Sequence, residues 1–455
     1  MRKDVVLEIL ADWNFWANRE IDTGIKRSGY VKELINLATK TNQIICIVGV
    51  RRAGKSYLMR QIAQELKKGD GSNTLIVNLE DERWLTRDLK LLREIYDVYL
   101  ERVKSEGKPF IFLDEVQTIE DWERFVRGVH ERNEANIFIA GSSSRLLSAE
   151  LATLLTGRHI IFFVHPLCFS EFLGFKDLRI EKEIEIIAKR VKIKRFLNEY
   201  LEFGGFPEVA LAGEKKRLLL SYFETIIIRD IIDRFKIRER EKIKTLAKYY
   251  LTNTASLISF NKLSRFLNIP LTTVERFSSY LETANLIFFV RRFSYSLKEQ
   301  EKSQRKVYSI DVGLSNAIGF RFSERFGRII KNVVAVELNK RKAFNPWIEV
   351  YYWRDYAGRE VDFVIKEGIK VKELIQVCWD PSDHETRERE LKALLKALAG
   401  FKLKKALVIT EDVEKAEKID DRVIIYKPLW KWLLPIGNDK GLITSEDVTE
   451  NKLLN

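Results

Sequence analysis

Short apolar runs separated by longer amphipathic segments mark the first third of the chain. The runs cover residues 43–49, 108–114, 136–141 and 159–164. Continuous apolar runs of this length are typical of strands buried on both faces of a parallel sheet. We therefore expect an α/β domain over residues 1–165, with a doubly wound sheet whose ligands bind at the carboxyl ends of the strands.

The pattern changes in the middle of the chain to short helices followed by a hairpin. The expected helices cover residues 242–251, 260–267 and 272–282, and the expected hairpin pairs residues 286–293 with residues 305–310. A tight turn through Asn268 and Pro270 joins the second helix to the third, and the hairpin tip at 298–306 is charged. This order of elements predicts a winged helix-turn-helix.

A second α/β pattern follows. The expected elements are a helix from about residue 326, strands at 349–353, 360–365 and 372–378, a helix at 385–398 and a strand at 405–410. The remaining residues, 437–455, are polar with little periodicity, and we expect a loosely packed tail.

A phosphate-binding motif follows the first apolar run. The sequence Gly49-Val-Arg-Arg-Ala-Gly-Lys55-Ser56 has the spacing GxxxxGK[ST], between a strand and a helix. Backbone N–H groups of such a loop converge on phosphate oxygens at the positive end of a helix. We expect Lys55 to neutralise the β- and γ-phosphates of ATP and Ser56 to ligate Mg²⁺. The predicted nucleotide-binding residues are Gly49, Val50, Arg51, Arg52, Ala53, Gly54, Lys55, Ser56 and Tyr57.

Two carboxylates end the second apolar run. Asp114 is expected to hold the metal's water shell, and Glu115, one residue further along, is the candidate base for the attacking water. Acidic residues after buried strands are common, but a pair about sixty residues after a phosphate loop favours hydrolysis over passive binding.

Hydroxyl groups and arginines follow the third run. Ser143 and Arg145 belong to the segment Ser142-Ser-Ser-Arg145, where a serine could orient water and the arginine could contact phosphate within its own chain or in a neighbouring subunit. A serine-rich turn that caps the next helix is the alternative. Arg158 is the alternative candidate for this phosphate contact, and the sequence does not distinguish between the two arginines.

The motifs together resemble a known family. The phosphate loop, Leu-Asp-Glu-Val-Gln at 113–117, Gly-Ser-Ser-Ser-Arg at 141–145 and later blocks at 203–209, 308–313 and 360–364 are similar to archaeal and bacterial AAA-type ATPases with a C-terminal region of unknown function. The resemblance implies an ATPase core at 1–165, a helical lid at 166–235, a winged helix at 236–318, a restriction-endonuclease-like α/β domain at 319–436 and the tail.

The resemblance to endonucleases also implies a remnant metal site. Enzymes of this shape use a helix Glu, a strand Asp, and a Glu or Gln two residues before a Lys. Glu337, Asp362 and Gln376 fill the first three places, but Cys378 stands where the lysine is expected. An active nuclease would need Lys370 or Lys372 to supply the cation, so a degenerate domain that binds DNA or a partner is the favoured alternative.

The net charge of +13 is concentrated in one segment. Residues 231–310 contain 16 Lys or Arg and 7 Asp or Glu, a local balance of +9. This balance favours DNA as a partner, although basic faces are often only solvated. The candidate contacts are Thr272, Thr273 and Arg276 in the third helix, for the major groove, and Lys302, Arg305 and Lys306 in the wing, for phosphates.

Two functions remain open on these grounds. One is a DNA-directed ATPase, which would show DNA-stimulated turnover; the other is a nucleotide-dependent signalling switch that recruits protein partners. An arginine near the sheet edge favours a homo-oligomer with shared sites. No apolar run approaches 18 residues and the first turns are acidic, so we expect a soluble, cytoplasmic protein without a membrane partner. The high content of charged residues resembles that of thermophilic proteins, and the family includes archaeal members.

Overall fold

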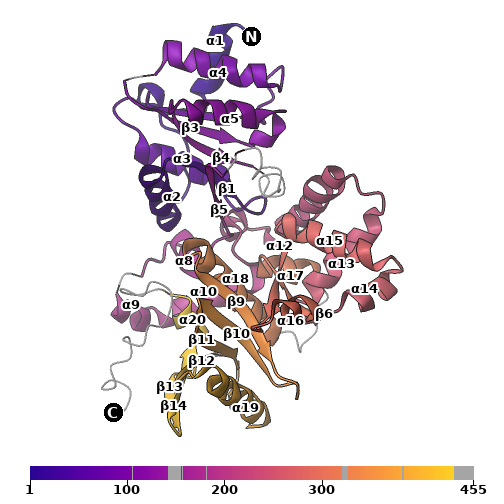
Figure 1. The fold of residues 1–455 in the computed structure, drawn as a ribbon. Helices are drawn as coiled ribbons and strands as arrows, with labels where there is room; N and C mark the ends of the chain where they lie inside the picture. The colour runs from indigo at the N-terminus through magenta and orange to yellow at the C-terminus, as the bar shows by residue number, and fades with distance from the viewer. Residues whose placement is uncertain are drawn as a thin grey trace. The chain divides into compact units, whose positions relative to one another are not determined.

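A computed structural model describes residues 1–104, 106–141, 155, 157–180, 182–319, 326–381 and 384–434. The chain divides into two compact units, residues 1–165 with 283–285, and residues 166–282 with 286–455. Each unit has a sheet of its own (Figure 1). The expectation of an α/β chain with several parts is confirmed.

The first unit contains a five-stranded sheet in the order β2-β3-β4-β1-β5, with every neighbouring pair parallel. Its strands are β1 (Ile44–Val48), β2 (Thr74–Asn78), β3 (Phe110–Asp114), β4 (Asn136–Ala140) and β5 (His159–Phe163). Its helices are α1 (Lys3–Ala11), η1 (Trp16–Asn18), α2 (Ser28–Lys40), α3 (Lys55–Leu66), α4 (Leu89–Arg102), η2 (Val116–Thr118) and α5 (Trp122–Glu131). β1 is fully buried because its apolar run is covered on both faces. The carboxyl ends of these parallel strands meet at one edge of the sheet.

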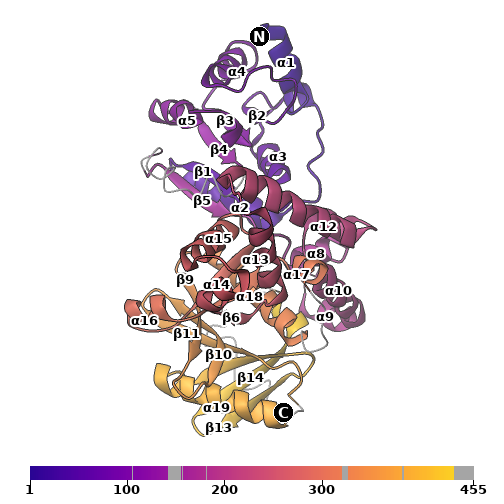
Figure 2. The same ribbon diagram turned by 90° about the vertical axis from the view of Figure 1, so that its right-hand side faces the viewer.

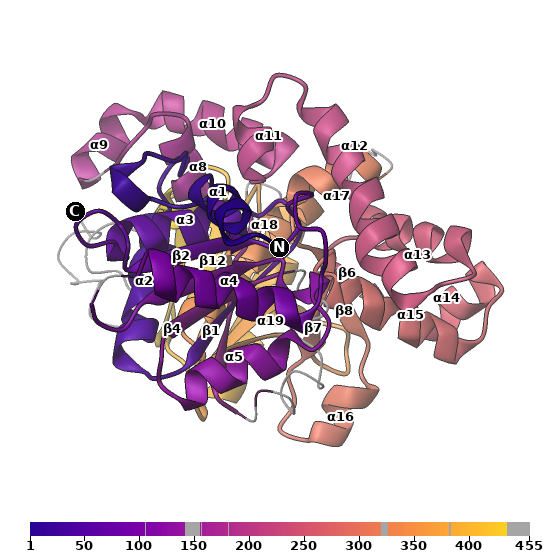
Figure 3. The same ribbon diagram turned by 90° about the horizontal axis from the view of Figure 1, so that it is seen from above.

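The second unit begins with a helical region and ends with a mixed sheet. The helices are α8 (Phe169–Phe175), α9 (Glu183–Ala188), α10 (Arg190–Phe203), α11 (Pro207–Leu211), α12 (Lys215–Thr225), the π-helical η3 (Ile226–Asp233), α13 (Arg240–Thr252), α14 (Phe260–Leu267), α15 (Leu271–Thr283), α16 (Leu297–Lys302), α17 (Val312–Ile318), α18 (Phe326–Phe344), α19 (His384–Phe401) and α20 (Leu429–Trp432). α13, α14 and α15 form a cluster (Figure 3).

Nine strands form the sheet of the second unit, in the order β13-β14-β12-β11-β10-β9-β7-β8-β6. Their bounds are β6 (Ser256–Ile258), β7 (Ile287–Arg292), β8 (Arg305–Ser309), β9 (Ile348–Arg354), β10 (Glu360–Glu367), β11 (Lys370–Val377), β12 (Lys405–Thr410), β13 (Lys415–Ile419) and β14 (Arg422–Pro428). α19 packs against β10, β11 and β12 (Figure 2).

The predicted hairpin forms, but it is not a free wing. β7 and β8 pair antiparallel, and helix α16 occupies the connection that was expected to be a simple charged tip. β7 also pairs in parallel with β9, through Arg291 opposite Tyr351 and Arg292 opposite Tyr352. The expected boundary between residues 318 and 319 therefore falls inside one continuous sheet.

Around a buried carboxylate of the second unit, the backbone segments approach so closely that two positions require glycine. Asp311 caps α17 by accepting from the backbone N–H of Leu314 (3.2 Å), and it also accepts from Gly205 N–H (2.7 Å). A Cβ at Gly205 would lie 2.1 Å from the carbonyl oxygen of Leu167, and a Cβ at Gly313 would lie 2.0 Å from that of Phe203. Only glycine lets these segments approach so closely.

This packing predicts that Gly205→Ala destabilises the protein by about 3 kcal/mol, since the added methyl group must displace backbone. Gly213→Ala is the matched control, because no atom lies within 4 Å of its Cβ position and its backbone is not left-handed. Urea denaturation followed by tryptophan fluorescence measures both. Equal stability of the two variants would contradict the role of this contact.

Candidate functional site

The phosphate loop leaves the carboxyl end of β1 and leads directly into α3. Gly49 (φ 152°) could not carry a side chain, since its Cβ would lie 2.2 Å from the carbonyl oxygen of Val164. Gly54 (φ 92°) precedes the first residue of α3, and Arg52 between them is also left-handed (φ 69°). The loop is therefore packed against the end of β5, with its backbone leading to the N-terminus of a helix.

Lys55 turns back across this loop. Its side chain is buried, and its ammonium group donates to the carbonyl oxygens of Gly49 (3.1 Å) and Val50 (3.3 Å). A cation buried beside a helix N-terminus is well suited to an anion, and carbonyl contacts are weaker than the charge-assisted bonds a phosphate offers.

Asp114 ends β3 and lies beside the start of α3. Burial, and then the charge of Glu115, raise the pKa of Asp114 to about 6, while a hydrogen bond from Ser56 and the charge of Lys55 oppose the rise. A buried carboxylate next to a hydroxyl is a suitable pair of oxygen ligands for Mg²⁺, whose charge would favour the ionised form of Asp114. The residues present therefore fit the expected metal.

Glu115 leaves the line of the strand because its backbone is left-handed (φ 52°, ψ 42°). This conformation is uncommon in residues other than glycine and often occurs at functional sites. The Gln117 side chain donates to the Glu115 carboxylate, and Thr118 Oγ1 donates to its carbonyl oxygen (2.9 Å). The half-buried carboxylate thus has a fixed position beside Asp114.

Arg27 is a residue of this region that the sequence analysis missed. It is buried, and its guanidinium donates to the carbonyl oxygens of Ala53 (3.0 Å) and His165 (3.0 Å). Its backbone N–H donates to Gln61, whose amide in turn donates to the carbonyl oxygen of Ile25 (3.0 Å). Arg27 therefore connects the segment before α2 to the phosphate loop and to the end of β5. No local motif marks it, because its partners are distant in sequence.

Of the predicted serine and arginines, the structure describes only Arg158, which does not lie at this edge. Ser143 and Arg145 lie outside the described residues. Arg158 precedes β5, and its carbonyl oxygen accepts from Ile44 N–H (3.0 Å) at the start of β1. The phosphate loop follows the other end of β1, so the prediction that Arg158 reaches the phosphates of its own chain is wrong. Its guanidinium pairs instead with Glu131 of α5, and contact across subunits stays a prediction.

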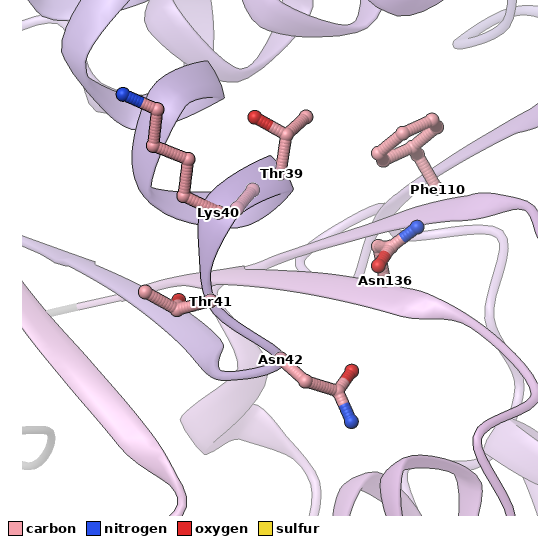
Figure 4. A pocket seen from close by; sticks show the side chains of 7 residues that line it. Thr39, Lys40, Thr41, Asn42, Phe110 and Asn136 are labelled. Atoms are coloured by element: carbon pink, nitrogen blue, oxygen red, sulfur yellow. The ribbon is translucent and has the colours of Figure 1, made fainter.

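A hollow of about 440 Å³ lies at the amino ends of the same strands (Figure 4). Residues 38–42, Phe110 and Asn136 line it, and Lys108 beside it donates to Asn42 (3.2 Å) and Asn133 (2.6 Å). Since the phosphate loop is at the carboxyl ends, this hollow does not belong to the candidate nucleotide site.

The endonuclease-like residues are only partly brought together. Asp362 of β10 is fully buried, and its backbone N–H donates to Gln376 Oε1 on the neighbouring strand (3.0 Å). Glu337 of α18 does not join them and pairs with Arg341 (3.1 Å). Helix α18 instead directs Lys331 to Asp362, because Lys331 lies nearly two turns before Glu337.

Two ammonium groups contact the Asp362 carboxylate. Lys331 Nζ lies 2.7 Å and Lys306 Nζ 3.2 Å from Oδ1. Burial alone would raise the pKa of Asp362, but the charges of Lys331 and Lys306 outweigh it and hold that pKa below its usual range. Lys370 and Lys372, expected as substitute cations, are exposed at the far end of β11. In the part of the chain that the structure describes, no group of three or more His, Cys, Asp or Glu residues could hold a metal ion.

Lys306 was expected to contact DNA phosphates, and this prediction is wrong. Only 2 % of its side chain is exposed, because β8 lies inside the continuous sheet and turns this residue toward Glu360 and Asp362. The other candidates remain at or near the surface. Thr272, Arg276 and Lys302 are exposed, Thr273 is half-buried, and Arg305 pairs with Glu301 (3.2 Å).

The charge cluster predicts that Asp362→Asn destabilises the protein by about 3–5 kcal/mol, since it removes the carboxylate that Lys331 contacts and leaves Lys306 with Glu360 alone. Glu349→Gln, which breaks a more exposed pair with Lys366, is the control and costs below about 1 kcal/mol. Because the folded pKa of Asp362 is lowered, its stabilisation is complete above about pH 4 and is lost as the pH falls further. Urea denaturation across this pH range measures the free energy of unfolding of both variants. An equal loss of stability in Asp362→Asn and Glu349→Gln would contradict the role of the cluster.

Three family models match the chain in succession. An AAA domain covers residues 41–173, and two domains of unknown function, DUF8612 and DUF4143, cover residues 194–324 and 326–432. A solved Walker-type ATPase of Pyrococcus abyssi is 14 % identical, with a TM-score of 0.42, over 65 % of this chain and 96 % of that one. Among the described residues, no helix is both long and apolar enough to cross a membrane.

Two uncharacterized relatives are similar over nearly their whole length. One from Methanocaldococcus jannaschii is 36 % identical over 423 residues, which are 90 % of this chain and 92 % of the relative. One from Haemophilus influenzae is 28 % identical over 89 % of this chain and 98 % of the relative. The expected resemblance is confirmed: the chain belongs to the family of archaeal and bacterial P-loop ATPases in which an AAA domain precedes C-terminal domains of unknown function.

Proposed function

We propose that the protein hydrolyses ATP with Mg²⁺ and couples its nucleotide state to DNA binding through a winged helix. The observation that carries the first part is the meeting of the phosphate loop, Lys55, Ser56 and Asp114 at one edge of the first sheet. AAA domains as a class bind and hydrolyse ATP, which agrees with this arrangement.

Each group has a separate task in the proposed reaction. The loop N–H groups bind the phosphates, and Lys55 exchanges two carbonyl contacts for β- and γ-phosphate oxygens. Ser56 and Asp114 would hold Mg²⁺, which when bound would neutralise charge on the phosphates. Glu115 aligns the attacking water and accepts its proton. Its left-handed backbone and the hydrogen bond from Gln117 support a fixed position for this base.

Mg-ATP turnover of matched variants tests this assignment. We expect Lys55→Ala to abolish turnover, and Glu115→Gln to retain ATP binding while lowering kcat about 10²- to 10⁴-fold. Lys32→Ala, which removes an exposed lysine from α2 of the same unit, controls for charge and should leave kcat unchanged. A Glu115→Gln enzyme with normal turnover would remove the base assignment.

Element order supports the winged helix. α13, β6, α14, α15, β7 and β8 follow one another, and β8 pairs antiparallel with both β6 and β7. Asn268, in the left-handed conformation, ends α14 and permits the tight turn into α15. The third helix of this arrangement, α15, carries Thr272 and Arg276 on its exposed side, where a major groove could receive them.

The buried lysines argue against the nuclease alternative. Two ammonium groups already satisfy Asp362, so a second cation there would meet like charge. We therefore propose that the C-terminal strands support the winged helix rather than cleave DNA.

We expect Arg276→Ala to weaken duplex DNA binding about tenfold without changing ATP affinity. Lys392→Ala on α19 removes the same charge from a different surface and is the matched control. Fluorescence anisotropy with a labelled duplex measures both variants. Equal duplex affinity in the two would rule out α15 as the contact helix, and ATP turnover indifferent to DNA would favour the signalling switch.

A further inference from the structure

Two tyrosines are almost fully exposed just after two neighbouring strands of the second sheet. Tyr295 is 85 % exposed and follows β7, and Tyr356 is 96 % exposed and follows β9. β7 and β9 are parallel neighbours with Arg292 opposite Tyr352, so both strands end at the same edge. The two rings therefore lie on adjacent loops, since parallel neighbours are about 5 Å apart.

Both loops are fixed by hydrogen bonds. In the turn that carries Tyr356, Asp355 and Arg359 exchange backbone and side-chain bonds, from Asp355 N–H to Arg359 O (3.0 Å) and from Arg359 N–H to Asp355 Oδ1 (2.9 Å). In the loop that carries Tyr295, Gln300 donates to the Ser294 carbonyl oxygen (2.6 Å), and the Tyr295 ring contacts Phe293 edge-on with centroids 5.1 Å apart. Fixed loops lose little entropy when they bind a ligand.

Arg292 lies at one of the two rings, and further cations lie on neighbouring segments. The Arg292 guanidinium lies 5.9 Å from the Tyr356 ring centroid and donates to the Arg354 carbonyl oxygen. Lys298 is exposed on α16, close to Tyr295 in sequence, and Lys396 of α19 lies 2.8 Å from Asp355. Figure 2 shows α16 beside β9.

One acidic group of this edge, Asp355, is already neutralised by cations. Burial opposes ionisation of Asp355, but hydrogen bonds from Lys396 and Arg359 hold its pKa well below the usual range. The Glu299 carboxylate accepts from the Ser294 hydroxyl (2.8 Å). The surface thus combines exposed aromatic rings with an excess of positive charge.

We propose that this tyrosine surface, formed by Tyr295, Tyr356, Arg292, Arg354, Lys298 and Lys396, binds single-stranded nucleic acid. The tyrosine rings stack on unpaired bases, and the arginines and lysines contact the phosphates. The inference extends the proposed function, because it rests on the same assumption of a nucleic-acid partner.

Unpaired strands fit this surface better than a duplex does. Bases in a duplex are stacked on one another, so their faces are closed to a side chain, whereas every unpaired base offers a face to an aromatic ring. The surroundings of the rings are cationic, and nucleic acid supplies the complementary charge.

Fluorescence anisotropy of the full-length protein with a labelled oligothymidylate of about 20 nucleotides tests the proposal. Tyr295→Ala/Tyr356→Ala should raise the Kd for this strand about 100-fold, because each of the two stacked rings contributes about tenfold. Tyr295→Phe/Tyr356→Phe keeps the rings and should stay within about twofold of the wild-type protein. Trp347→Ala removes a side chain that is 70 % exposed before the opposite end of β9, and should leave the Kd unchanged.

The outcomes separate this surface from the proposed function. Loss of single-strand binding in the double alanine variant, with duplex binding and ATP turnover intact, supports the tyrosine surface. An unchanged Kd in that variant, an equal loss in Trp347→Ala, or no oligothymidylate binding by the wild-type protein overturns it. Turnover and the duplex affinity of Arg276→Ala report on the proposed function independently.

Discussion

The buried charge of Asp362 is the constraint on which the second unit depends. Its carboxylate has no access to solvent, and it is neutralised by Lys306 from β8 and Lys331 from α18. A buried acid is stable only when such partners come together, so β8 and α18 must meet around it. The same requirement withdraws Lys306 from the surface and places two ammonium groups beside the Asp362 carboxylate.

The buried acid of the first unit, Asp114, has a different environment. Asp114 meets a hydroxyl, the charge of Lys55 and the opposing charge of Glu115, and its pKa is raised; Asp362 meets two ammonium groups, and its pKa is lowered. An acid whose charge is poorly compensated within the protein gains most from a bound cation, and an acid already compensated gains least. This contrast distinguishes the proposed metal ligand from the structural carboxylate, although both end up on strands of buried sheets.

Features encoded by neighbouring residues were predictable from the sequence. The phosphate loop directly follows one apolar strand, and Asp114 and Glu115 stand at the end of another. The proximity of Asp362 and Gln376 follows from the pairing of two strands that are adjacent in the sequence. The failures came from long-range pairing. No local pattern predicts the β7–β9 pairing that buries Lys306, or the parallel pairing that puts Arg158 at the amino end of β1. Arg27 has partners up to 138 residues away, so no local pattern could reveal it.

The β7–β9 pairing also changes what the C-terminal strands can do. A wing joined by a linker would move independently, but here β7 is bonded to β8 on one side and β9 on the other. The hairpin and the strands that follow it therefore belong to one sheet. The proposed groove-reading helix α15 leads into β7, and the tyrosine surface lies where β7 and β9 end. The two proposed contacts, at α15 and at the tyrosine surface, are therefore joined through β7.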